Sequence, residues 1–262
     1  MRSVPCPAGH GKKEFTDRLV SLLRTFPASA AGIALPGFLD EKRRRILHLS
    51  NLPKLDGLDL AARLERRLKW KIILEADSNA GAIGEARLGA GRGIRRLLYL
   101  TMGTGLGAAL TVKGIPVRVS NNTIGHIAGL PIGPAKKREA EKLLGARGIL
   151  RRFREAGGDR RVSTPLALYE LARSGDVGAR AAWKETGELL AELLAILVPM
   201  LRPDGVVLGG GIAGAADTFL PTTLRALRRR LRGFEPGCPE IFPAALEAYA
   251  GAAGAALSAR SP

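Results

Sequence analysis

The sequence of 262 residues predicts an α/β fold, because short apolar segments of strand length alternate with longer segments of helical periodicity. Two of the predicted strands run directly into glycine-rich turns, at 103–107 and at 209–211. Hydrophobic residues make up 46% of the chain, which is enough to build the core of one large domain or of two smaller ones.

The first part of the chain alternates helices with strands. The spacing of apolar residues predicts helices at 14–26, 58–68 and 78–88, and strands at 31–35, 45–49 and 71–75. Asp77 or Ser78 is expected to cap the third helix, because a side-chain oxygen at that position can accept a hydrogen bond from the first helical N–H groups.

The stretch from Leu97 to Leu110 predicts a strand, a tight turn and a second strand. The turn reads Gly103-Thr104-Gly105-Leu106-Gly107 and follows Thr101. Glycines at alternate positions leave backbone N–H groups open to an anion, and threonine hydroxyls add donors. The turn is therefore a candidate phosphate cradle, although a plain glycine-rich hairpin has the same pattern. It is neither a Walker loop, since no Gly-Lys-Ser/Thr follows, nor a Rossmann fingerprint.

The remainder of the chain is predicted to be mainly helical. One apolar strand at 205–208 interrupts it and runs into Gly209, Gly210 and Gly211. The helical segments are a basic one at 133–165, then 165–173, 179–201 and 218–231, and an alanine-rich one at 244–258.

Composition excludes several classes of protein. The net charge is +17, but the basic clusters are spread along the chain and no aromatic residues interleave with them, so a solvated arginine-rich surface is favoured over a nucleic-acid site. The longest apolar run, 189–201, contains Glu192 and Pro199, which argues against a membrane span. Residues 1–20 lack the apolar core of a signal peptide, so we expect a cytoplasmic protein. Cys6 and Cys238 are too few for a disulfide framework or a zinc site.

Four features follow one another in a specific order. They are Pro36-Gly37 after a strand, Asp77-Ser78-Asn79-Ala80 with Gly84-Glu85 after another, the turn at 103–107, and Gly209-Gly210-Gly211 about 100 residues later. Together with Ile124-Gly125-His126, they resemble the ROK family (repressor, open reading frame, kinase) of bacterial sugar kinases and sugar-responsive regulators. The resemblance covers nearly the whole chain and implies a two-lobed actin-like ATPase (ribonuclease H-like) fold.

The resemblance implies a role for each motif. Asp77 would be the catalytic base for transfer of a phosphoryl group from ATP, with Mg²⁺, to a sugar hydroxyl. The nucleotide would bind at two segments: the phosphates at Gly103, Thr104, Gly105 and Gly107, and the adenosine at Gly209, Gly210 and Gly211. The sugar would bind at Pro36, Gly37, Asn51 and His126. From local sequence alone, Asp77 could instead be a helix cap, His126 a structural histidine and Gly209–Gly211 a packing turn.

The chain also departs from the family pattern. The first phosphate segment of the family, Asp-x-Gly-Gly-Thr, does not occur, and residues 1–7 resemble the tail of the third strand of the family's first lobe. We therefore expect an incomplete N-terminal lobe. Ala76 and Thr123 stand where the family has an asparagine and a glutamate that bind sugar. No cysteine follows His126 before Cys238, so no zinc and no metal-ligating residue is predicted.

The sequence leaves two hypotheses for function. The first is an ATP-dependent sugar kinase, similar to a glucokinase that acts on hexoses. The alternative is a catalytically impaired pseudokinase, or a relative that binds nucleotide or sugar without turnover. A family-type transcriptional regulator is disfavoured, because no DNA-binding domain fits before residue 30. We expect one lobe from 1–95 with 246–262 and another from 96–245, and leave a homodimer open.

Overall fold

A computed structural model describes residues 11–49, 51–136, 138–235 and 237–260. The expected strand tail at residues 1–7, Cys6 and Ser50 lie outside the described residues. The helices are α1 Lys12–Leu23, α2 Leu60–Leu68, α3 Asp77–Leu88, α4 Ala140–Leu144, α5 Ala146–Glu155, α6 Pro165–Arg173, α7 Val177–Leu201, α8 Ala216–Arg230 and α9 Ala250–Arg260. The strands are β1 Ala30–Leu35, β2 Phe38–Leu39, β3 Ile46–His48, β4 Lys71–Ala76, β5 Arg96–Met102, β6 Leu106–Val112, β7 Ile115–Pro116, β8 Pro131–Ile132, β9 Arg138–Glu139, β10 Gly205–Gly209 and β11 Glu240–Pro243.

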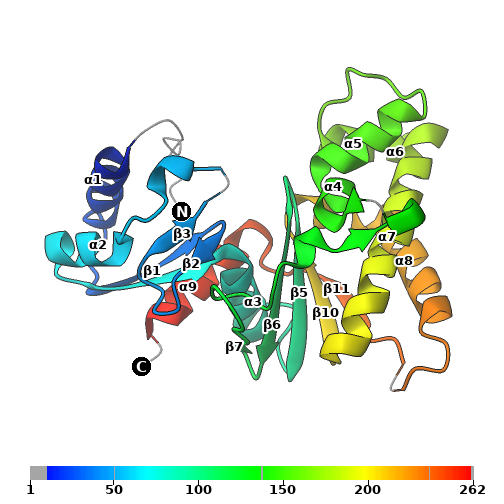
Figure 1. Ribbon diagram of the computed structural model, residues 1–262. Coiled ribbons are helices and arrows are strands. Elements are labelled where there is room, and N and C mark those ends of the chain that lie inside the picture. The colour runs from blue at the N-terminus through cyan, green and yellow to red at the C-terminus, as the bar shows by residue number, and fades with distance from the viewer. Residues whose placement is uncertain (1–10, 50, 137, 236, 261–262) are drawn as a thin grey trace.

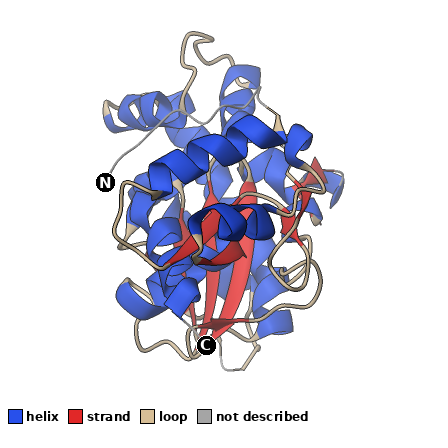
Figure 2. Ribbon diagram, turned by 90° about the vertical axis from the view of Figure 1, so that its left-hand side faces the viewer, coloured by secondary structure: helices blue, strands red, loops and turns tan. Residues whose placement is uncertain are grey.

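The larger sheet has the strand order β11-β10-β5-β6-β7. Strand β10 runs parallel to both β5 and β11, whereas β5 and β6 form the predicted antiparallel hairpin. The register places Gly209 opposite Thr101, so the two glycine turns leave the sheet at the same edge. Helices lie on both sides of the strands (Figure 2).

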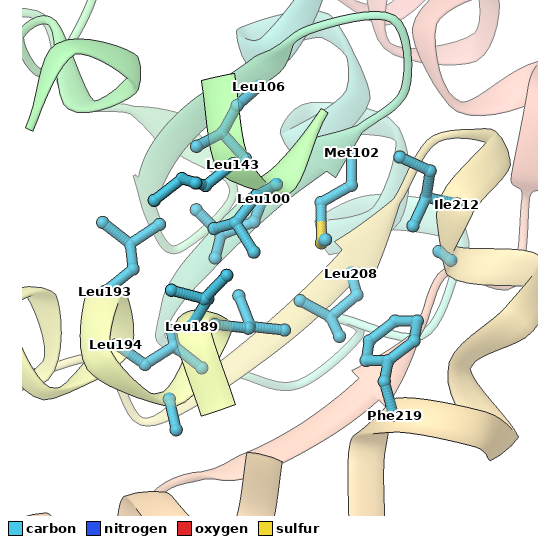
Figure 3. Close-up of a cluster of buried hydrophobic side chains, with 14 of the residues drawn as sticks. Leu100, Met102, Leu106, Leu143, Leu189, Leu193, Leu194, Leu208, Ile212 and Phe219 are labelled. Atoms are coloured by element: carbon cyan, nitrogen blue, oxygen red, sulfur yellow. The ribbon is translucent and has the colours of Figure 1, made fainter. Parts of the chain in front are cut away.

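The main hydrophobic core lies between this sheet and helices α7 and α8. In Figure 3, Leu100, Met102 and Leu106 of the hairpin point toward Leu189, Leu193 and Leu194 of α7, with Leu208 and Phe219 beside them. The buried ring of Trp183 stacks on Phe219 at 5.9 Å between ring centroids. Burial of these large side chains fixes the hairpin, and with it the phosphate turn, against the helices.

The smaller sheet pairs β1 with β4 in parallel, and α1 and α2 cover it (Figure 1). Helix α9, from the far end of the chain, packs beside α3. Glycines make this approach possible: a Cβ atom at Gly254 would overlap the carbonyl oxygen of Ala80, and one at Gly84 would overlap that of Ala250. The C-terminal helix therefore supports α3, the helix that begins at Asp77.

The predicted α/β alternation is confirmed, with three corrections. Residues 133–165 are not one helix, because β9, α4 and α5 occupy 138–155. Helix α5 ends just before a turn in which Gly157 has a φ of +86°. The last helix begins at Ala250 rather than at 244. The N-cap of α3 is Ala76, not Asp77 or Ser78, and it makes no side-chain capping bond. Strand β11 was not predicted, because its short Glu-Ile-Phe-Pro sequence gives no clear period.

Candidate active site

A cavity of about 700 Å³ opens between the end of β4, the hairpin turn after β5, the loop at 123–128 and helices α4 and α5. Nine of the predicted site residues line it, contributed by segments from both halves of the chain: Pro36, Gly37, Asn51, Asp77, Gly103, Thr104, Gly105, Gly107 and His126. The fold thus brings the candidate base, the candidate sugar residues and the candidate phosphate turn to one place.

Asp77 is the first residue of α3 and follows the last residue of the buried strand β4. Its Oδ1 accepts a hydrogen bond of 2.7 Å from the backbone N–H of Ser78. The carboxyl keeps a water-accessible surface inside the cavity, yet the surrounding walls raise its pKa above the usual 3.8, an effect that outweighs the backbone hydrogen bonds. A carboxylate with a raised pKa is a stronger proton acceptor, which suits a general base.

The shape of the glycine turn depends on a hydrogen bond within it and on a close contact with Thr101. The N–H of Gly103 donates to the carbonyl of Gly105 at 2.9 Å, and Thr104 at the tip is exposed to the cavity. A Cβ atom at Gly107 would lie 2.7 Å from Cγ2 of Thr101, so this position favours glycine. The exposed position of Thr104 lets its hydroxyl meet an anion in the cavity.

Helices α4 and α5 are fastened to this turn. The N–H of Ala146 donates to the carbonyl of Gly103 at 2.8 Å, and the N–H of Leu106 donates to Oε2 of Glu141 at 3.2 Å. Through this attachment four charged side chains that the sequence did not predict line the cavity: Glu141, Lys142, Arg147 and Arg151. The four-residue spacing of Arg147 and Arg151 is a signal for one helix face, but the sequence could not show that this face meets the phosphate turn.

The predicted sugar residues also line the cavity. Pro36 and Gly37 form the turn between β1 and β2, and Gly37 has a φ of +127°, which favours glycine. The ring of Phe38 meets His126 edge to face at 6.1 Å between centroids. His126 and Asn51 are both exposed, so their polar atoms are accessible to a ligand.

Gly209, Gly210 and Gly211 do not line this cavity. Gly209 is the last residue of β10, beside the end of β5, and Gly210 and Gly211 follow it. Gly210 has a φ of +80°, and a Cβ atom there would overlap the carbonyl oxygen of Met102. Gly211 is exposed and has open space around it. The structure thus places this turn one strand away from the phosphate turn, at the same edge of the sheet.

A buried polar network lies behind Asp77. The carboxylate of Glu75 is fully buried and pairs with Arg43 at 3.1 Å and with Arg118 at 2.6 Å. Nδ2 of Asn79 donates to Oε1 of Glu75 at 3.0 Å and to the carbonyl of Asn122 at 2.6 Å. The network ties β4 and α3 to the loop that leads to His126.

Some side chains of the cavity could hold Mg²⁺ together with substrate phosphates. The described residues contain no group of three or more His, Cys, Asp or Glu residues that could hold an ion by themselves. The cavity offers the carboxylates of Asp77 and Glu141 and the hydroxyls of Thr101 and Thr104. Hard oxygen donors of this kind suit Mg²⁺, which protein carboxylates and substrate phosphates hold together.

Among the described helices, none is both long and apolar enough to cross a membrane.

Comparison with known proteins gives consistent results. A model of the ROK family matches residues 4–261. The glucokinase of Halalkalibacterium halodurans is 30% identical over 209 residues, which are 72% of this chain and 63% of that enzyme, so the match spans less than two thirds of that relative. The structure of a ROK hexokinase from Thermus thermophilus matches with a TM-score of 0.83 and 30% identity, and the match covers 98% of this chain and 88% of that one. A Streptomyces griseus ROK glucokinase in complex with glucose and AMPPNP matches with a TM-score of 0.84 and 24% identity over 98% and 90% of the chains.

Proposed function

The chain belongs to the ROK family and has its actin-like ATPase fold, and on this premise we propose that it transfers the terminal phosphoryl group of ATP to a hexose hydroxyl. The observation that carries the proposal is one cavity in which Asp77, with its raised pKa, and the glycine turn at 103–107 both take part. The hexokinase and glucokinase relatives support the class of reaction.

In this proposal the carboxylate of Asp77 accepts the proton of the attacking hydroxyl group. The hydroxyl oxygen then forms a bond to the terminal phosphorus, and the bond from that phosphorus to the bridging oxygen breaks. Backbone N–H groups of the glycine turn and the hydroxyl of Thr104 donate hydrogen bonds to the phosphoryl oxygens. Lys142 and Arg147 on the cavity wall offset the negative charge of the phosphates.

Mg²⁺ would be held by the phosphates together with Asp77 or Glu141, and when bound it would neutralise charge on the phosphoryl oxygens. The proposal includes no zinc. Gly209, Gly210 and Gly211 are proposed to lie against the adenosine, and their place at the same sheet edge as the phosphate turn supports this.

The sugar is proposed to bind near Pro36, Gly37, Asn51 and His126. Glu141 joins this set, because its carboxylate reaches the same cavity and can accept hydrogen bonds from sugar hydroxyls. The glucokinase from S. griseus, which was crystallised with glucose and AMPPNP, supports a hexose and a nucleotide as the two ligands. We also propose that the chain divides into two lobes, one at 1–95 with 246–262 and the other at 96–245, and the packing of α9 on α3 supports this division. A cytoplasmic location belongs to the same proposal.

The test is ADP release measured in a coupled assay with ATP, Mg²⁺ and a panel of hexoses. We expect one or more hexoses to stimulate release, and Asp77→Asn to lower kcat by about 10²- to 10⁴-fold, because the general base is lost. Asp217→Asn is the matched control: Asp217 also lies in the first turn of a helix, but outside the cavity. If ATP binds but no hexose stimulates release, the chain is the non-catalytic relative instead.

A further inference from the structure

Glu85 lies near the end of α3 and is fully buried. In the described part of the chain, three backbone N–H groups donate to its carboxylate. Oε2 accepts from Ala90 at 2.8 Å and from Ala245 at 3.1 Å, and Oε1 accepts from Leu246 at 2.8 Å. Burial of a carboxylate is costly unless such bonds satisfy it, so these three bonds are the reason that Glu85 can lie here.

The donors come from two segments that are far apart in the sequence. The segment at 89–95, which we call the first connection, joins α3 to β5 and contains Ala90. The segment at 244–249, the second connection, joins β11 to α9 and contains Ala245 and Leu246, which lie 160 and 161 residues beyond the carboxylate. In the proposed division into lobes, these are the two places where the chain passes from one lobe to the other. One carboxylate therefore holds both connections.

Backbone contacts fasten each connection further. The N–H groups of Gly89 and Gly91 donate to the carbonyl of Glu85 at 3.1 and 3.0 Å. A Cβ atom at Gly89 would overlap Oε2 of Glu85, so glycine lets the chain turn back over the carboxylate. On the second connection, the N–H of Ala244 donates to the carbonyl of Leu208 at 2.8 Å, which ties that segment to β10. Glu85 thus joins helix α3 to chain that is itself bonded to the larger sheet.

Helix α3 carries Asp77 at its other end. In Figure 1, α3 and α9 lie between the smaller sheet and the larger one. The first turn of α3 touches the phosphate turn, since Cβ of Ser78 lies 3.3 Å from where a Cβ atom at Gly107 would be. From Asp77 to Glu85 the helix rises about 12 Å, at 1.5 Å per residue, so a tilt of about 5° at Glu85 moves Asp77 by about 1 Å. A displacement of about 1 Å in a reacting group can lower a rate by about 10²-fold.

We propose that Glu85 is a positioning residue: by bonding both connections, it sets the place of α3, and with it Asp77, relative to the glycine turn at 103–107. This inference rests on the proposed kinase function and on the proposed division into lobes. Pro36 and Gly37, candidate residues for the sugar, belong to one lobe, and the glycine turn belongs to the other. Glu85 therefore also sets how the two ligands face each other.

Two simpler roles for Glu85 account for less of the geometry. A carboxylate that only ended α3 would need the bond from Ala90 and not the two bonds from the second connection. A carboxylate that only neutralised a buried cation would lie in an ion pair, as Glu75 does with two arginines, whereas the bonds to Glu85 come from backbone N–H groups. A carboxylate accepts on both oxygens at once, while a glutamine amide has one acceptor oxygen and one NH₂ donor.

The first test measures kcat for one hexose together with the affinity for each ligand alone. We expect kcat to fall about tenfold in Glu85→Gln and about 10²-fold in Glu85→Ala, because glutamine keeps one acceptor oxygen and alanine keeps none. The dissociation constants for the hexose alone and for a non-hydrolysable ATP analogue alone should stay within about twofold, because each ligand still meets its own set of residues. Glu85→Gln carries the test if the alanine variant does not fold.

Asp204→Asn is the matched control for these variants. Asp204 also accepts a hydrogen bond from a distant backbone group, the N–H of Arg96 at 2.9 Å, but both residues lie in the same proposed lobe. The control should therefore keep the wild-type kcat. An unchanged kcat in the Glu85 variants, an equal loss in the control, or single-ligand affinities that fall as far as kcat does overturns the proposal.

The second test does not depend on activity. In Glu85→Ala, hydrogen exchange followed by mass spectrometry should show the N–H groups at 89–91 and at 244–246 exchanging about tenfold faster than in the wild-type protein, while α7 keeps its protection. Faster exchange in one segment alone, or in neither, overturns the inference that Glu85 holds both connections. If the wild-type protein turns over no hexose, the proposed kinase function fails, and the exchange comparison decides whether Glu85 joins the two segments.

Discussion

The carboxylate of Glu75 and the guanidinium of Arg118 form an ion pair, with 2.6 Å between Oε2 and Nη2, that joins strand β4 to the segment after β7. Glu75 is fully buried, and it lies two residues before Asp77. The segment that carries Arg118 continues to Asn122, whose Nδ2 donates to the carbonyl of Asp40, and then to His126. The pair therefore holds the segment that leads to His126 against the strand that precedes Asp77.

Glu75→Gln should destabilise the protein and weaken sugar binding. Removal of the charge leaves Arg43 and Arg118, each about a quarter exposed (28% and 27%), without a carboxylate. We expect the free energy of unfolding in urea to fall by about 1–3 kcal/mol and the KM for the sugar to rise severalfold, because the loop before His126 loses its anchor.

Glu188→Gln is the control for this variant. Glu188 pairs with Arg229 at 3.4 Å on the surface, where an ion pair contributes little to stability. Equal unfolding curves for the two variants would show that the Glu75 network does not hold the loop.

The activity should fall at acid pH through a pKa above the ordinary 3.8 of an aspartate. Burial in the cavity raises the pKa of Asp77, and the base must be ionised to accept a proton, so protonation removes activity. The measurement is kcat/KM for the sugar against pH, and Asp217→Asn should leave the acid limb in place. If the acid limb of the profile gives a pKa at or below 3.8, the assignment of Asp77 as the base is contradicted.

The raised pKa of Asp77 also predicts how the Asp77→Asn substitution changes stability. The folded protein disfavours the ionised form of this carboxyl, so the fold loses stability as the pH rises from the unfolded pKa through the raised folded pKa. At pH 7 the neutral asparagine should therefore raise, not lower, the free energy of unfolding measured in urea. Lost activity together with undiminished stability separates a catalytic role from a folding defect, whereas a clearly destabilised variant would contradict this reasoning.

The residues that sequence could identify are those with local signals. Asp77 stands at a strand end, and the turn at 103–107 is marked by its own glycines, so both were predicted to belong to the site and both line the cavity. Glu141, Lys142, Arg147 and Arg151 were not predicted to do so, because they reach the cavity only when α4 and α5 are fastened to the turn by long-range hydrogen bonds. The error at 133–165 has the same origin, since a run of basic helix formers does not show where tertiary contacts interrupt it.

His126→Gln should raise the KM for the sugar about tenfold and leave the KM for ATP nearly unchanged. The exposed His126 lines the cavity and is a candidate sugar residue, and one hydrogen bond to a ligand contributes roughly 1–2 kcal/mol. His48→Gln is a matched control, because His48 is also exposed and its Nδ1 contacts Asp56 at 2.8 Å outside the cavity. If the KM for ATP rises instead, His126 contacts the nucleotide rather than the sugar.

Helix α9 offers a matched pair of glycines that tests how the C-terminal helix supports Asp77. Gly254→Ala would place a Cβ atom inside the carbonyl oxygen of Ala80 on α3, so the two helices must separate. Gly251, one turn earlier, has open space around it, and Gly251→Ala should stabilise the helix by up to about 1 kcal/mol. We therefore expect thermal unfolding at a lower temperature for Gly254→Ala and at an equal or higher one for Gly251→Ala. Because α3 begins at Asp77, kcat should fall in the first variant and stay constant in the second. If both variants unfold alike, the close contact between α3 and α9 is not what holds the start of α3 in place.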